Sequence, residues 1–216
     1  MLTMMPMAAC DGSNADPILP EQPGQPGNSD GGDEDDSTNP TNPIPGGNGR
    51  YLVLYCSRTG STERMAQQIQ QTLDCDILEV EPQTPYESDY NGMLNRAQEE
   101  LAAIRQGNYP AIKTSVEDFG NYDIVFVGYP IWYGSMATPM QTFLHNHASK
   151  LAGKRIALFA SSGSSGISAS VDEARTLCSG ATFTETLLLT SSTLSQMGNR
   201  IRTWLETSVR VGKTII

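Results

Sequence analysis

The segment from Ser57 to Thr62 is the part of the chain whose residue types and spacing best suit ligand binding. It follows a short apolar run and precedes a helical pattern, which predicts a tight turn between a buried strand and a helix. Backbone N–H groups in such a turn converge on one point, and the helix dipole adds positive potential there. Hydroxyl groups add donors, and glycine allows backbone angles that other residues rarely adopt. We expect a cofactor phosphate to bind at Ser57, Arg58, Thr59, Gly60, Ser61 and Thr62.

Other phosphate-binding and catalytic turns fit this segment less well. A nucleoside-triphosphate loop needs the pattern G-x-x-x-x-G-K-[ST], and this turn contains no lysine. A dinucleotide loop needs three spaced glycines, whereas only Gly60 is present. A thiol-dependent phosphatase would need an arginine six residues after its cysteine, but the sixth residue after Cys56 is Thr62. Two interpretations are left: a monophosphate held by neutral donors with Arg58 as the one possible charge, or a plain turn whose hydroxyls cap the helix.

Strand and helix patterns alternate from Arg50 onward. Near-continuous apolar runs predict parallel strands buried on both faces, and an alternating charged run at 76–81 predicts an edge strand. Five strands alternating with five helices predict an α/β three-layer sandwich around a five-stranded parallel sheet of order 2-1-3-4-5. The buried strands are predicted at 51–55, 124–127, 156–160 and 187–189, and the helices at 65–73, 93–104, 140–147, 167–178 and 194–205.

Two further loops should flank the phosphate turn. In this strand order the first and third strands are neighbours whose connections leave in opposite directions, so a ligand belongs beyond their carboxyl ends. A Trp-Tyr pair after the third strand can stack on a planar ring or, alternatively, cap the edge of the core. Serines and glycines after the fourth strand allow close backbone approach to a polar ring edge. The candidate binding residues are Pro130, Ile131, Trp132, Tyr133 and Gly134 in one loop and Ser161, Ser162, Gly163, Ser164 and Gly166 in the other.

Together these motifs resemble those of the flavodoxin family. Residues 57–62 match the family pattern [ST]-x-T-G-x-T, and residues 86–91 are similar to Y-x-x-D-Y-N. Residues 128–134 match the Y-P-I-W-[WY]-G loop of a bacterial flavodoxin-like subfamily, and the resemblance covers about residues 50–210. It implies a flavodoxin-like fold with non-covalently bound FMN. Residues 57–62 would hold its phosphate, Trp132 and its neighbours would cover one face of the isoalloxazine, and residues 161–166 would border the pyrimidine side.

Two departures from the family pattern concern the ring site. The subfamily often has glycine where Ser164 stands, and the loop after the fourth strand lacks the aromatic residue that shields the second ring face in many electron carriers. An open face leaves room for a nicotinamide or a quinone, unless Tyr86 or Tyr90 folds over it. The resemblance therefore implies an FMN-dependent oxidoreductase or electron-transfer protein. Its partner would be a redox protein or a small molecule, for example a quinone reduced with NAD(P)H.

The alternative function is a surface-anchored binding module that keeps the fold but has weak or lost FMN binding. No side chain is a candidate general acid or base, so no catalytic residue is assigned. His145 and His147 are two positions apart on a helix and point to different faces, so no metal site is expected. The sequence Gly163-Ser164-Ser165-Gly166 is not a G-x-S-x-G motif, which argues against a serine hydrolase.

The chain divides into three segments: 1–10, 11–49 and 50–216. The first is apolar and ends in Met7-Ala8-Ala9-Cys10, which resembles a bacterial lipoprotein cleavage box whose cysteine is lipidated. The charged start of such a signal is missing, so either the true start lies upstream or the segment is a frayed terminus. We expect lipidation of Cys10 and a cell-envelope lipoprotein held to the membrane by this anchor alone, with a cytoplasmic protein as the alternative.

Residues 11–49 carry most of the negative charge. They contain eight acidic residues, no Lys or Arg, and fifteen Pro or Gly, so we predict a disordered tether. Of the chain's 24 acidic and 14 basic residues, this leaves 16 acidic and 14 basic in the domain. The domain has no basic excess, which argues against nucleic acid as a partner.

Overall fold

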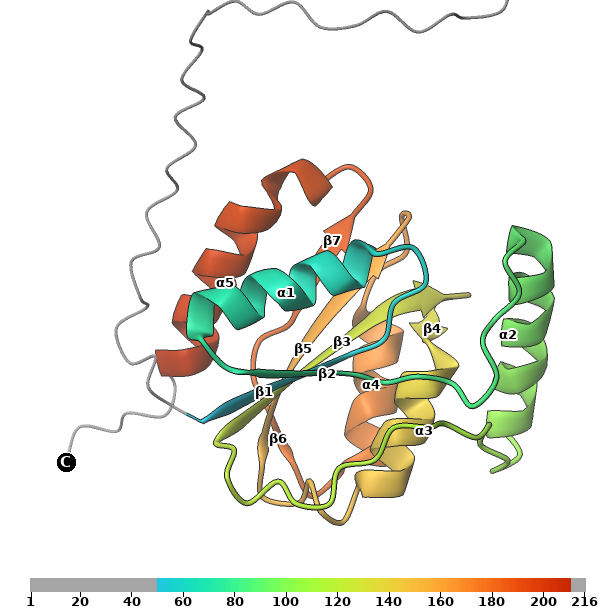
Figure 1. Cartoon of the computed structure of the whole chain (residues 1–216), viewed down its shortest axis with the longest axis horizontal. Coiled ribbons are helices and arrows are strands. Elements are labelled where there is room, and N and C mark those ends of the chain that lie inside the picture. The colour runs from blue at the N-terminus through green and yellow to red at the C-terminus, as the bar shows by residue number, and fades with distance from the viewer. Residues whose placement is uncertain (1–49, 211–216) are drawn as a thin grey trace, which may run out of the picture. The chain divides into compact units, whose positions relative to one another are not determined.

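A parallel β-sheet runs through the centre of residues 50–210, the part of the chain that the computed structural model describes (Figure 1). The strands lie in the order β2 (Asp76–Glu79), β1 (Tyr51–Tyr55), β3 (Ile124–Trp132) and β5 (Arg155–Ser162), and β6 (Thr182–Phe183) and β7 (Leu187–Thr190) both pair with β5. These pairs are all parallel. With β7 as the fifth strand, the predicted order and the three-layer α/β sandwich are confirmed.

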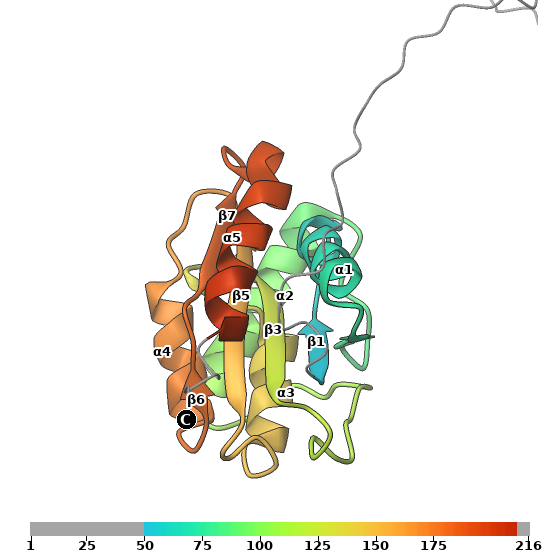
Figure 2. The ribbon, with the colours of Figure 1, turned by 90° about the vertical axis from the view of Figure 1, so that its left-hand side faces the viewer.

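Helices cover both faces of the sheet (Figures 1 and 2). On one face lie α1 (Ser61–Leu73) and α5 (Met197–Arg210), which follows the short 3-10 helix η1 (Leu194–Gln196). On the other face lie α3 (Thr138–His147) and α4 (Ser168–Leu177), and α2 (Tyr90–Ile104) packs against α3. None of the helices in the described range is long and apolar enough to span a membrane.

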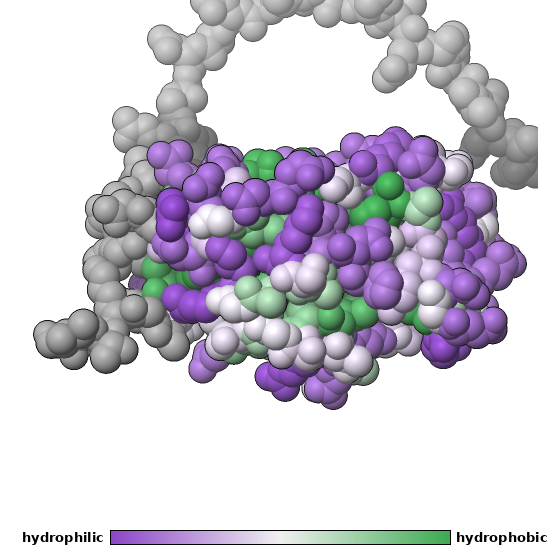
Figure 3. All heavy atoms as spheres, turned by 90° about the horizontal axis from the view of Figure 1, so that it is seen from below, coloured by the Kyte–Doolittle hydropathy of each residue, from purple (hydrophilic) through white to green (hydrophobic). Residues whose placement is uncertain are grey.

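The strands are built from apolar runs because both of their faces are covered. Alternate residues of β1 separate into two cores: Leu52 and Leu54 pack toward α3 and α4, whereas Val53 packs toward α1 and α5. In contrast, every residue of the edge strand β2 is exposed. On the face shown in Figure 3, hydrophilic side chains predominate and hydrophobic ones appear in small separate areas. The central strands are therefore buried between two layers of helices, whereas the edge strand β2 is open to solvent.

The structure differs from the predicted strand boundaries after the third strand. Residues Pro130 to Trp132 were expected in a loop, but they extend β3 and pair with the antiparallel strand β4 (Ser135–Met136). The turn between them consists of Tyr133 and Gly134, with φ of 52° and 80°. Positive φ at both central residues suits a two-residue hairpin turn, which is the reason that the strand continues. The ring-binding candidates thus sit on a hairpin.

The N-terminal predictions concern residues that the structure does not describe. The lipidation site Cys10, the segment 1–10 and the tether 11–49 all lie outside the described residues, as do residues 211–216.

Candidate functional site

The loop from β1 to α1 presents a row of unpaired backbone donors. Among the described residues, no N–H group from Ser57 to Glu63 donates a hydrogen bond; the next, Arg64 N–H, donates to the carbonyl of Gly60 at 3.0 Å. Gly60 is the N-cap with φ 79°, and no side chain caps α1. Since buried or half-buried N–H groups are rarely left without a partner, this loop is arranged for an external acceptor. With the positive end of α1, it fits an anion such as a phosphate.

The hydroxyl groups of this loop are used in two ways. Thr62 is buried, and its Oγ1 lies 2.8 Å from Ser161 Oγ, which joins the start of α1 to the end of β5. The hydroxyls of Ser57, Thr59 and Ser61 make no hydrogen bond within the described part of the chain. Thr62 therefore fixes the two loops relative to each other, and the other three hydroxyls are available to a ligand.

The sequence suggested Arg58 as the one possible charge for a phosphate, but in the structure its guanidinium is already hydrogen-bonded to other groups. Its guanidinium donates to the carbonyls of Ser88 at 3.0 Å, Asp89 at 3.2 Å and Glu87 at 3.5 Å, and lies 5.9 Å from the ring centre of Tyr90. The carbonyls that open α2 converge on this side of the loop and attract the cation. Arg58 thus ties the phosphate-type loop to the segment before α2.

A cavity of about 440 Å³ opens beside the loop. Its size falls in the usual range for small-molecule sites. The structure brings most of the predicted binding residues to its wall, but Gly60, Gly134 and Gly166 do not line it. The predicted residues on its wall are Ser57, Arg58, Thr59, Ser61, Thr62, Pro130, Ile131, Trp132, Tyr133, Ser161, Ser162, Gly163 and Ser164.

Several lining residues were not among the sequence candidates. Met93 and Leu94 come from the first turns of α2, Ser191 follows β7, and Leu194 opens η1. Tyr90, which the sequence suggested as a possible cover for the ring, also lines the cavity. Ser191 could have been found, because the carboxyl ends of all parallel strands meet at one edge of the sheet. The α2 residues carried no such signal, since their position depends on how the segment before the helix folds.

The aromatic wall of this cavity is held by a network behind it. Trp132 packs edge-to-face on Tyr86, with ring centres 5.0 Å apart. The Tyr86 hydroxyl lies 2.7 Å from Thr138 Oγ1 and donates to Glu100, while the Arg96 guanidinium lies 4.2 Å from the Tyr86 ring centre. Burial, and the Glu100 carboxylate next, raise the pKa of Tyr86, so it stays protonated. Trp132 is therefore fixed before any ligand arrives.

The cavity offers almost no ionisable chemistry of its own. Among the described residues that line it, Arg58 is the one charged side chain, and its guanidinium is already hydrogen-bonded. Cys56 lies below the loop, and burial raises the pKa of its thiol, so it is not a nucleophile at neutral pH. Redox or group-transfer chemistry here must come from a bound cofactor.

Comparison with known families agrees with this geometry. The family profile of flavodoxin matches residues 50–208, nearly the whole described domain. The chain belongs to the flavodoxin family. The expected ligand crevice lies at the carboxyl edge of the sheet. It is surrounded by the loop after β1, the β3–β4 hairpin and the loop after β5. No curated protein matches the chain.

Solved flavodoxin-like structures resemble the chain over the same region. A candidate flavoprotein from Bacteroides eggerthii is 33% identical, with a TM-score of 0.61, over 73% of this chain and 96% of its own. Another from Bacteroides uniformis is 28% identical, with a TM-score of 0.60, over 71% and 98%. A flavoprotein from Lactobacillus acidophilus, solved in complex with FMN, is 25% identical, with a TM-score of 0.56, over 69% and 98%.

Proposed function

We propose that this flavodoxin-family domain binds FMN non-covalently and uses it to transfer electrons. The observation that carries the proposal is the row of unpaired N–H groups from Ser57 to Glu63 beside a cavity with an aromatic wall. A phosphate needs such donors, and a flavin ring needs a flat apolar surface. The FMN complex of the Lactobacillus acidophilus flavoprotein supports the same cofactor.

The residues around the cavity fit FMN without a charged partner for its phosphate. The N–H groups of the loop and the hydroxyls of Ser57, Thr59 and Ser61 would hold the phosphate. The hairpin with Trp132 would lie against the isoalloxazine, and the loop after β5 would border its polar edge. FMN, when bound, supplies the redox chemistry. The chain orients the cofactor and places an aromatic side chain against its ring.

The same residues influence how readily the bound cofactor is reduced. Arg58 is the one cation on the described wall, and it is hydrogen-bonded to the segment before α2. Negative charge added to the ring would therefore meet little compensation, and charge is costly where solvent is excluded. We expect a reduction potential below that of free FMN.

We further propose that the domain reduces small planar acceptors such as quinones with NAD(P)H. The side of the cavity formed by the β5 loop is lined by serines and Gly163, which leaves space at the ring. Tyr90 is 63% exposed at the cavity rim and does not close it. NAD(P)H oxidation that depends on both FMN and a quinone would support reductase activity; reduction by a protein partner alone would indicate a carrier.

We also propose that Cys10 anchors the protein to the cell envelope. The sequence Met7-Ala8-Ala9-Cys10 and the acidic, Pro/Gly-rich residues 11–49 support an anchor followed by a tether. The Cys10→Ser variant should move the protein from the detergent phase to the aqueous phase in a phase-partition assay. Equal partitioning of the two proteins would argue for the cytoplasmic alternative.

Titration with FMN and with riboflavin tests the central proposal. Flavin fluorescence should be quenched when either compound enters the ring site, but riboflavin lacks the phosphate. We expect FMN to bind at least about tenfold more tightly, because charge-assisted hydrogen bonds contribute about 1.5–3 kcal/mol. Equal affinities would contradict the phosphate assignment. A colourless protein that takes up neither flavin would instead favour the binding-module alternative.

A further inference from the structure

Strand β4 is the outer strand of the hairpin that carries Trp132, and among the described residues it pairs with β3 alone. In β4, Met136 stands opposite Ile131, and the next residue, Ala137, donates its N–H to the Pro130 carbonyl at 3.1 Å. Backbone groups of successive residues in an antiparallel strand point in opposite directions. Because the Ala137 N–H points toward β3, the N–H and carbonyl groups of Met136 point away from β3 and need partners outside the hairpin.

Both backbone groups of Met136 are hydrogen-bonded to side chains from helices. The Met136 N–H donates to Glu173 Oε2 of α4 at 2.8 Å, and the Met136 carbonyl accepts from Gln141 Nε2 of α3 at 2.7 Å. Met136 and Gln141 are buried. Gln141 is only five residues further along the chain, whereas Glu173 is 37 residues away. Glu173 therefore joins the hairpin to a separate part of the fold.

Helix α4 is also bonded to β3, one turn before Glu173. Ser170 Oγ lies 3.1 Å from Tyr129 Oη and donates to the Ile167 carbonyl at 2.8 Å, and both Ser170 and Tyr129 are buried. Ser170 and Glu173 are three positions apart, so they lie on the same face of the helix. Two hydrogen bonds thus set the position of α4 against the end of β3 and its hairpin.

Helix α4 follows directly from the other loop of the proposed ring site. Strand β5 ends at Ser162 and α4 begins at Ser168, so α4 fixes the far end of the loop at 161–166. The cavity has Trp132 and Tyr133 of the hairpin on its wall, together with residues 161–165 of this loop. The separation of these two parts of the wall therefore depends on how α4 is attached to the hairpin.

Glu173 is a charged residue that serves as an acceptor for a main-chain group. Within the described residues no cation pairs with its carboxylate, while its neighbour Asp172 pairs with Arg175 at 3.9 Å. A hydrogen bond to a charged acceptor is shorter and roughly twice as strong as one between neutral groups. The contact that this carboxylate makes with the Met136 N–H is therefore suited to holding the hairpin firmly.

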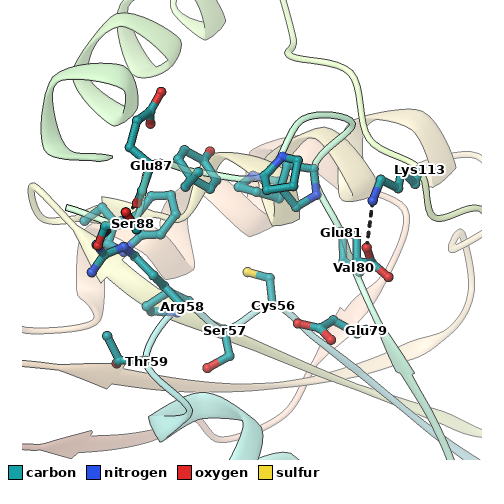
Figure 4. Close-up of a pocket in the computed structure, with 16 residues that line it drawn as sticks. Cys56, Ser57, Arg58, Thr59, Glu79, Val80, Glu81, Glu87, Ser88 and Lys113 are labelled. Carbon is teal, nitrogen blue, oxygen red and sulfur yellow. Dashed lines mark hydrogen bonds and ion pairs between the residues drawn. The ribbon is translucent and has the colours of Figure 1, made fainter. Parts of the chain in front are cut away.

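The opposite side of Trp132 has a support of its own. The Trp132 ring packs on Tyr86, and the segment that carries Tyr86 is joined to the loop after β1 by the Arg58 guanidinium. In Figure 4, Arg58 reaches from that loop toward Ser88 of this segment. Trp132 thus lies between a support on the β2 side and a hairpin whose strand β4 is held by Glu173.

We propose that Glu173 is a positioning residue for the flavin ring. It holds the β3–β4 hairpin, and with it Trp132, at the distance from the 161–166 loop that the ring requires. This inference rests on the proposed function, because the ring is that of FMN. Loss of Glu173 should weaken contacts with the ring and leave contacts with the phosphate unchanged. The phosphate donors lie in the loop after β1, which is joined through Thr62 to the end of β5 rather than to α4.

Amide hydrogen exchange of the full chain without flavin tests the hold on the hairpin. Glu173→Met removes the acceptor and keeps a good helix former, so the Met136 amide should exchange about ten- to a hundredfold faster. Glu173→Gln keeps a neutral oxygen acceptor, so exchange should be only about three- to tenfold faster. Asp172→Met removes a carboxylate from the neighbouring, exposed position of α4 and should leave the rate unchanged. Equal rates in Glu173→Met and the wild type would overturn the proposal.

Fluorescence titration with FMN and with riboflavin tests the link to the ring, which both compounds carry. Glu173→Met should weaken both by the same factor, about three- to tenfold, because a wall that is in place for part of the time lowers the apparent affinity by that fraction. Glu173→Gln should recover most of the loss. The ratio of the two affinities should stay at the wild-type value, whereas the double variant Ser57→Ala, Thr59→Val should lower it. A changed ratio in Glu173→Met, or unchanged affinities, would overturn the positioning role.

The two measurements separate this inference from the proposed function. If the wild type binds both flavins but Glu173→Met changes neither exchange nor affinity, the proposed function stands and the role of Glu173 fails. If the wild type binds neither flavin but the Met136 amide exchanges faster in Glu173→Met, the proposed function fails while the hold of Glu173 on the hairpin stands.

Discussion

The segments that follow β1 and β2 leave the same edge of the sheet, but their backbone groups are satisfied to different degrees. After β1, the N–H groups from Ser57 to Glu63 have no partner within the described residues. After β2, several groups are tied: Val80 N–H donates to the carbonyl of Tyr55, and Gln83 N–H to that of Ala111. The carbonyls of residues 84 and 85 accept from Arg96, and those of 87–89 accept from Arg58.

The loop after β1 is therefore suited to binding a ligand, whereas the segment after β2 is suited to holding the structure around it. An open backbone loop costs stability unless a ligand or water satisfies it, so it is kept where a ligand binds. The tied segment carries Tyr86, which holds Trp132, and it accepts the Arg58 guanidinium. We therefore expect substitutions after β2 to lower stability and substitutions after β1 to lower cofactor affinity.

The largest effect is expected for Arg96→Met in the tied segment. Arg96 pairs with Glu100 at 2.8 Å, with side chains only 20% and 13% exposed, and donates to the carbonyls of residues 84 and 85. Removing it leaves Glu100 with an uncompensated charge, so the free energy of unfolding should fall by about 3 kcal/mol in urea denaturation. The control Arg105→Met, at the exposed end of α2, should change it by less than about 0.5 kcal/mol. Equal losses would break the comparison.

The double variant Ser57→Ala, Thr59→Val probes the open loop. These hydroxyls have no partner in the described chain, so the free energy of unfolding should stay within about 0.5 kcal/mol of the wild type. FMN affinity should fall by about ten- to a hundredfold, because two hydrogen bonds to a charged phosphate are lost. Fluorescence titration measures this loss, and Ser115→Ala, far along the sequence and outside the cavity, is the matched control. A stability loss without an affinity loss would reverse our assignment.

A smaller effect is expected where the two roles meet, at Thr62. Thr62→Val leaves the buried Ser161 hydroxyl without its partner, which should cost about 1–2 kcal/mol of unfolding free energy. Thr62→Ser keeps the hydroxyl and should recover most of that loss. Thermal and urea unfolding of the three proteins distinguish these outcomes, and equal stability of the Val and Ser variants would show that the Thr62–Ser161 bond is unimportant.

The smallest effect is expected for Glu79→Gln, and it depends on pH. Burial raises the pKa of Glu79 above its ordinary value of 4.5, so folding disfavours the ionised carboxylate. The penalty is absent below the ordinary pKa and is complete above the folded pKa. The variant should therefore match the wild type at about pH 3 and exceed it by only about 0.3 kcal/mol at about pH 7, since the group is exposed. A larger gain at the lower pH would contradict the sign.

The sequence alone determined the sheet and the position of the main loop. Apolar runs such as that of β1 can be satisfied only when helices bury both faces, and this fixes a three-layer arrangement. The turn 57–62 could be assigned because it combines hydroxyls and Gly60 between a strand and a helix. Both signals are local, so they are readable from residues that are neighbours in the chain.

Only the tertiary structure decided how the long-range partners are shared. It placed the Arg58 guanidinium on the carbonyls before α2, and it extended β3 through Trp132 into a hairpin. It also brought Met93 and Leu94 to the cavity wall, and it left the exposed Glu79 carboxylate with one long hydrogen bond, from Tyr55 Oη, among the described residues. These outcomes depend on which groups meet in space. A hydrogen-bond donor pairs with an acceptor that folding brings close to it, and that acceptor can be far away in the sequence.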